Sequence, residues 1–158
     1  MNTQTDQIVN RTNELFEQGF CCSESVLQAV TERHGITSPL IPRIATGLCG
    51  GISRSGGICG AVSGGVLAIS VVSGRSSARE SREENHRLVR TFLNECENKF
   101  GSTNCEKLLG CRLDTPEGQK FFADHKLREK CAGFTREAAQ IAARVLDENR
   151  TGPRPNVL

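Results

Sequence analysis

The chain is built from segments whose apolar residues recur at helical spacing, and most of these segments end at a glycine. Glycine is common just after a helix because it adopts the left-handed conformation that stops the helix at little cost. No alternating apolar run is long enough for a β-sheet. The sequence therefore predicts an all-α fold. The clearest such segments are residues 5–18, 23–34, 88–100 and 105–109, which precede Gly19, Gly35, Gly101 and Gly110.

Proline and hydroxyl residues mark the starts of further helices. Ser38 and Pro39 predict a helix that runs to Leu48, because proline at the first helical position loses no hydrogen bond. Thr115 followed by Pro116 is a second start signal of this kind. A last helix is expected over about residues 135–147. We therefore expect a single-domain helical bundle of about six to seven helices.

The most apolar segment, residues 61–74, follows a glycine-rich loop over residues 49–60. Its apolar core falls well short of the roughly 20 residues that a membrane span needs, so a buried central helix is expected. Several β-branched residues leave a strand as the alternative for part of it. Gly60, Gly64 and Ala68 lie four apart and give a face almost without side chains. That spacing favours tight packing of this helix against another. It also leaves open that a cofactor or a second subunit approaches the face, and we expect a homodimer.

The length and charge of the chain favour a single domain and argue against binding of nucleic acid. The 158 residues contain no linker, so we expect one domain over residues 1–150 and a flexible tail over 151–158. The first residues lack the apolar stretch of a secretory signal, which predicts a cytoplasmic protein. A net charge of +2 from 20 basic and 18 acidic residues, with no Trp or Tyr, gives no reason to expect nucleic acid as a partner.

Eight cysteines in such a chain point to metal binding, catalysis or redox sensing, because structural disulfides are rare in a reducing compartment. Cys22, Cys59 and Cys105 each lie within two residues of a predicted helix start. The unpaired amides there are expected to lower the pKa of a thiol and leave more thiolate. Cys131 precedes Ala132 and Gly133, where a chain reversal could direct it inward.

The remaining cysteines and the histidines give weaker signals. Cys96 lies on an apolar helix face and is expected to be a core residue. For Cys21, Cys49 and Cys111, position alone does not separate a functional role from a packing role. There is no C-x-x-C pair, which leaves a thioredoxin-like dithiol or a zinc ribbon without support. No histidine has metal-ligand spacing, so His34, His86 and His125 are expected at the surface or at helix ends.

Residues 59–64 read C-G-A-V-S-G and match the pattern C-G-A-x-x-G. In this hexamer and in most of its length the chain resembles the C_GCAxxG_C_C family, whose members are described as redox-active. The other cysteines of the family pattern are matched by Cys22, Cys105 and Cys131. Related sequence forms the non-haem part of split-Soret cytochromes, but haem-attachment motifs are missing here. The four other cysteines depart from the pattern, and the neighbouring Cys21 leaves open which thiol of that pair is the matched one.

Three functions are compatible with these observations. In the first, Cys22, Cys59, Cys105 and Cys131 converge to hold an iron-sulfur cluster or another soft metal, and the protein transfers electrons to a redox partner protein. In the second, Cys59 is a reactive thiol that attacks a disulfide or peroxide, and a neighbouring cysteine resolves the product. In the third, the glycine-faced helix makes the protein a non-catalytic assembly module. The first is preferred.

Overall fold

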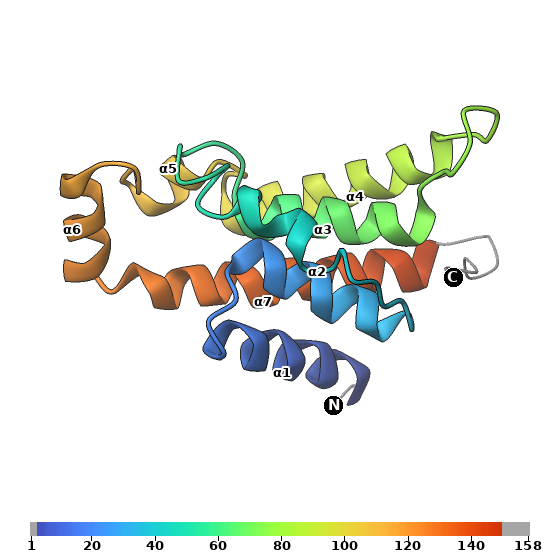
Figure 1. The fold of residues 1–158 in the computed structure, drawn as a ribbon, viewed down its shortest axis with the longest axis horizontal. Coiled ribbons are helices and arrows are strands. Elements are labelled where there is room, and N and C mark those ends of the chain that lie inside the picture. The colour runs from blue at the N-terminus through green and yellow to red at the C-terminus, as the bar shows by residue number, and fades with distance from the viewer. Residues whose placement is uncertain (1–2, 150–158) are drawn as a thin grey trace.

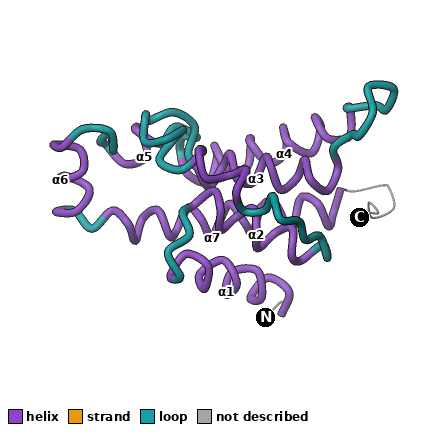
Figure 2. Tube along the Cα trace, viewed as in Figure 1, coloured by secondary structure: helices purple, strands orange, loops and turns teal. Residues whose placement is uncertain are grey.

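The computed structural model describes residues 3–149, and the predicted tail over residues 151–158 lies outside them. Within the described part the fold is all-α and forms a single domain, as predicted, with helices and no strand (Figure 2). The helices are α1 (Thr3–Glu17), α2 (Cys22–Arg33), the 3₁₀ helix η1 (Arg43–Leu48), α3 (Gly60–Ser73), α4 (Glu83–Phe100), α5 (Cys105–Leu109), α6 (Pro116–Asp124) and α7 (Leu127–Asn149).

The central helix of the bundle is α3, which packs against α2, α4 and α7 (Figure 1). Helix α1 packs on α2 and α7 from the other side, and α5 and α6 lie together at one end of the bundle. Val62, Ala68 and Ile69 of α3 are fully buried. A helix surrounded in this way satisfies its own backbone hydrogen bonds, which explains why the β-branched residues do not form the alternative strand.

The glycine face of α3 is covered by the start of α2. A Cβ atom built on Gly64 would lie 2.6 Å from the carbonyl oxygen of Ser23 and 2.8 Å from its Cα. At the next residue, Gly65, the ring of Phe92 occupies the space that a side chain would need. Tight packing within the chain therefore accounts for these glycines. A homodimer stays a prediction, and it would have to use another surface.

The helix predicted to begin at Pro39 is wrong. Residues 39–42 form turns, and only the 3₁₀ helix η1 follows. The reason is Pro42, which has no N–H to continue a helix begun at Pro39 and disfavours the α conformation at Ile41.

The last helix begins eight residues earlier than predicted, at Leu127 instead of residue 135. The chain reverses at Lys126, whose φ is +52°, and continues as helix through Ala132 and Gly133. A glycine inside a helix costs about 1 kcal/mol relative to alanine, which packing along a helix of 23 residues can offset. Cys131 therefore lies within α7 and not in a reversal.

Within residues 3–149, no helix has both the length and the apolar character needed to cross a membrane. This agrees with the prediction that residues 61–74 form a buried helix and not a membrane span.

Two glycine substitutions test whether glycine is required for close helix packing at Gly64 and not at Gly133. Gly64→Ala should destabilise the protein by about 1–3 kcal/mol, because its methyl group meets backbone atoms of Ser23 that cannot rotate away. The control is Gly133→Ala, whose nearest new neighbour is the Arg136 side chain at 3.9 Å, and it should stabilise by about 0.5–1 kcal/mol. Urea unfolding followed by circular dichroism measures both changes. Equal effects of the two variants would contradict the close α2–α3 approach.

Candidate cysteine-lined redox site

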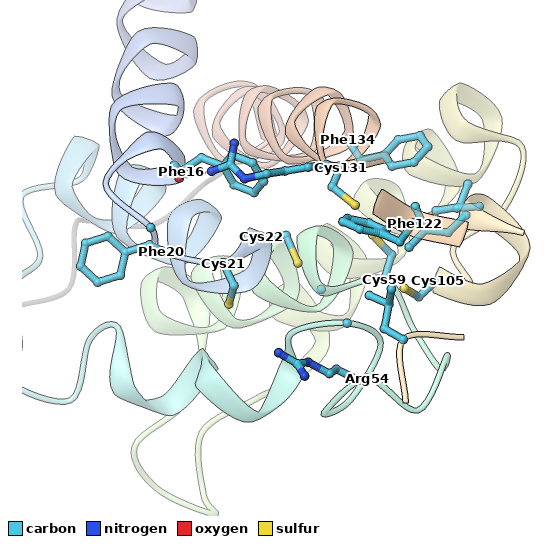
Figure 3. Close-up of a pocket in the computed structure, with 17 residues that line it drawn as sticks. Phe16, Phe20, Cys21, Cys22, Arg54, Cys59, Cys105, Phe122, Cys131 and Phe134 are labelled. Atoms are coloured by element: carbon cyan, nitrogen blue, oxygen red, sulfur yellow. Dashed lines mark hydrogen bonds between the residues drawn. The ribbon is translucent and has the colours of Figure 1, made fainter. Parts of the chain in front are cut away.

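Five cysteines line one pocket of about 410 Å³: Cys21, and four others that come from four separate elements. Cys22 begins α2, Cys59 precedes α3, Cys105 begins α5, and Cys131 lies in the second turn of α7. Figure 3 shows these side chains around a common space, although they come from distant parts of the sequence. The structure therefore brings together all four cysteines that the sequence selected. We call them the pocket thiols.

The rest of the pocket wall is mainly apolar, and two arginines join it. Arg128 donates a hydrogen bond of 3.0 Å to the carbonyl oxygen of Phe16, lies 4.5 Å above the centre of that ring, and pairs with Glu17. Its charge is thus already balanced. Arg54 is exposed and lies at the edge of the pocket (Figure 3). The apolar wall consists of Phe16, Phe20, Leu108, Leu109, Leu113, Phe122 and Phe134.

The loop before Cys59 contains five consecutive residues with left-handed backbone. From Gly50 to Arg54, φ lies between +50° and +71° at every position. The turn is compact: the Gly57 amide donates to the Gly51 carbonyl at 2.8 Å, and a Cβ on Gly51 would lie 2.6 Å from Cys105 Cβ. Only glycine can occupy that position next to Cys105. The sequence predicted a loop here but not its handedness.

Two backbone hydrogen bonds hold Cys59 and Cys105 side by side. The Cys59 amide donates to the Thr103 carbonyl, and the Cys105 amide donates to the Gly57 carbonyl, each at 2.7 Å. Asn104 reinforces the pair, because its side chain caps α5 and also donates to the Gly56 carbonyl at 2.9 Å. The cap of α5 and the loop before Cys59 therefore hold two of the four thiols in place.

Burial raises the pKa of every pocket thiol, and the other pocket thiols raise it further for all except Cys22. The pKa of Cys59 rises from an ordinary value of 9.0 to about 11, and those of Cys105 and Cys131 rise to about 12. The pKa of Cys22 is also raised, chiefly by burial. The low pKa values expected from the helix starts are therefore wrong.

The helix-start amides do act in the predicted direction. Backbone N–H groups of Ala61 and Val62 lower the pKa of Cys59, and the Gly50 amide lowers that of Cys22. Their effect is smaller than the cost of placing a bare negative charge in a buried, apolar site. The four thiols are consequently protonated at neutral pH unless a positive charge enters the pocket.

The pocket thiols are not spaced like the ligands of one tetrahedral metal ion. A tetrahedral zinc ion bound at about 2.3 Å places its ligand sulfurs about 3.8 Å apart. Among the residues described, the group of three potential ligand atoms lying within 4.8 Å of one another is Cys21, Glu24 and Cys49, and it includes none of the pocket thiols. Four sulfur donors around one cavity are a donor set of the kind that soft metals prefer.

Sequence reasoning missed a disulfide between Cys21 and Cys49. Their Cα atoms are 6.0 Å apart, and the bond links the N-cap of α2 to the residue after η1. No spacing in the sequence signals this pairing, because 28 positions separate the two residues and folding alone brings them together.

The other candidates lie outside the pocket. Cys96 is fully buried on α4, as expected of a core residue, and Cys111 is half-buried after α5. His34 and His125 follow the last residues of α2 and α6, and His86 lies in the first part of α4. None of the three histidines lines the pocket.

Residues 20–145 match the sequence profile of the family described as "Putative redox-active protein (C_GCAxxG_C_C)". The chain belongs to the C_GCAxxG_C_C family. No curated protein and no solved structure matches the chain. The matched range includes all four pocket thiols, so the family resemblance noted in the sequence is confirmed.

The pH dependence of thiol alkylation tests the state of Cys59. With a pKa of about 11, its iodoacetamide rate in the metal-free protein should be slow at neutral pH and rise about ten-fold per pH unit towards that value. Site-specific mass spectrometry measures the rate, and a free cysteine peptide, which levels off near its ordinary pKa, is the reference. A plateau already near neutral pH would contradict the raised pKa and restore the low-pKa prediction.

Proposed function

We propose that this C_GCAxxG_C_C protein binds an iron-sulfur cluster, or another metal group held by thiolates, through Cys22, Cys59, Cys105 and Cys131, and that it transfers electrons to a redox partner protein. The observation that carries the proposal is the convergence of these four side chains on one pocket. The membership of a redox-active family agrees with it.

The chemistry of the donors favours soft metals. Thiolates select iron-sulfur clusters, zinc or copper(I) over hard cations such as magnesium. Among the described residues, no three pocket thiols lie within 4.8 Å of one another, so a single zinc or copper ion would require them to move. A bound cluster would supply one-electron redox chemistry. The surrounding phenylalanine and leucine side chains would keep water away, which influences a reduction potential.

The raised pKa values support a cationic occupant. Protons neutralise the pocket thiols of the metal-free protein, and metal ions would replace those protons on binding. The amides of Gly50, Ala61 and Val62 lower the pKa of Cys22 and Cys59, so they favour the thiolate form of both residues. Once these sulfurs become thiolates, the same amides would hold them in place and share their charge.

The same finding weighs against Cys59 as a reactive thiol. A nucleophile of that kind needs a thiolate at neutral pH, whereas burial raises the pKa of Cys59 to about 11. The disulfide in the structure also joins two cysteines outside the set of pocket thiols. Both observations favour metal binding over thiol chemistry at Cys59.

Anaerobic purification tests the proposal. We expect a coloured protein with iron and acid-labile sulfide in near-stoichiometric amounts, measured by metal analysis and visible absorbance. Serine variants of Cys22, Cys59, Cys105 and Cys131 should each lose most of the iron, because a cluster needs its thiolate ligands. Cys111→Ser is the matched control, since Cys111 lies outside the pocket and should keep full iron content.

A colourless, iron-free anaerobic preparation of the unaltered protein would overturn the cluster. Equal loss of iron in Cys111→Ser and in the four pocket variants would overturn the assignment of the ligands. Circular dichroism of each variant shows whether a loss of iron follows from a loss of folding.

A further inference from the structure

The Cys21–Cys49 disulfide lies at the edge of the pocket and is open to reagents. Both residues are half-buried, and Cys21 itself lines the pocket beside Cys22 (Figure 3). Gly50, which follows Cys49, also lines it. A dithiol can therefore reach the bond without unfolding of the bundle.

The buried hydroxyl of Ser23 lies next to both sulfurs of this pair. Ser23 Oγ lies 3.4 Å from Cys21 Sγ and 3.2 Å from Cys49 Sγ, and it donates to the Ala45 carbonyl at 2.8 Å. Because its hydrogen is used on Ala45, the oxygen can accept from a thiol. The two S–H groups formed by reduction would thus find an acceptor already in place, which a purely structural disulfide does not need.

The segments joined by the disulfide are also held together without it. Besides the Ser23–Ala45 hydrogen bond, Glu24 accepts from the Thr46 hydroxyl at 2.6 Å and from the Cys21 amide at 2.9 Å. The bonds to Ala45 and Thr46 tie η1 to the start of α2, and the bond from Cys21 fixes the Glu24 side chain. Opening the disulfide would leave them intact, so the bond can break and re-form in the folded protein.

We propose that the Cys21–Cys49 pair is a second redox site, which exchanges two electrons with an external dithiol. One thiolate of the dithiol attacks a sulfur of the pair, the Cys21–Cys49 bond breaks, and the leaving sulfur takes up a proton. The second thiol of the reagent then attacks the mixed disulfide and frees the other cysteine as a thiol. The protein gains two electrons and two protons, and the dithiol leaves as a disulfide. This activity goes beyond the proposed function and does not require a metal in the pocket.

The test is reduction of the native full-length protein by dithiothreitol, followed by alkylation and peptide mass spectrometry. We expect new alkylation at two positions, Cys21 and Cys49, at a rate that stays constant as urea is raised below the unfolding transition. A structural disulfide would be reduced through unfolding and would react faster as urea rises. Glutathione at equal thiol concentration should act at least about ten-fold more slowly, because it lacks the second thiol that resolves the mixed disulfide.

Two controls make the outcome decisive. Cys111→Ser should exchange like the unaltered protein, and the double variant Cys21→Ser, Cys49→Ser should show no reducible bond. A rate that rises with urea, or full alkylation of both cysteines before any reductant is added, would overturn the proposal. Iron content is measured separately on the same samples, so failure of this site is distinguishable from failure of the metal site.

Discussion

The contact between the first turn of α2 and the glycine face of α3 determines where the site can form. At Gly64 the backbone of Ser23 takes the place of a side chain. This approach brings Cys22 against Gly60 and places the Ser23 hydroxyl on the Ala45 carbonyl. A pocket thiol and the disulfide edge are thus positioned by one close packing of two helices. A larger residue at Gly64 would push α2 away from α3 and would displace both Cys22 and the disulfide.

Competition between burial and local charge decides the chemistry of the cysteines. Helix-start amides favour thiolates, but a low-dielectric pocket disfavours them by a larger amount. The protein therefore stores the thiols in protonated form, which protects them from the oxidation that exposed thiolates undergo. Half-buried Cys21 and Cys49, at the edge, are the pair that is oxidised. A disulfide and four protonated thiols therefore lie along one pocket.

Local signals predicted much of this fold because capping and glycine stops act within a few residues. Helix α5 was predicted with its observed bounds, residues 105–109, and Gly110 ends it in the left-handed conformation. Prediction failed where a second local signal or a distant contact intervened, as with Pro42 before η1 and the early start of α7. The four pocket thiols were selected from the sequence, but their burial and the Cys21–Cys49 bond depend on tertiary structure that spacing does not encode.

The left-handed run from Gly50 to Arg54 has a consequence for the order of assembly. Ile52, Ser53 and Arg54 each pay about 1–2 kcal/mol to adopt this backbone, so the isolated segment does not favour it. Local backbone hydrogen bonds within residues 47–57 offset part of this cost. The bonds from Asn104 and Cys105 to the Gly56 and Gly57 carbonyls complete the turn, and they form only after distant parts of the chain have met. The lip of the pocket is consequently a late product of folding. Until it closes, the thiols of Cys59 and Cys105 are more open to solvent in a nascent chain than in the folded protein.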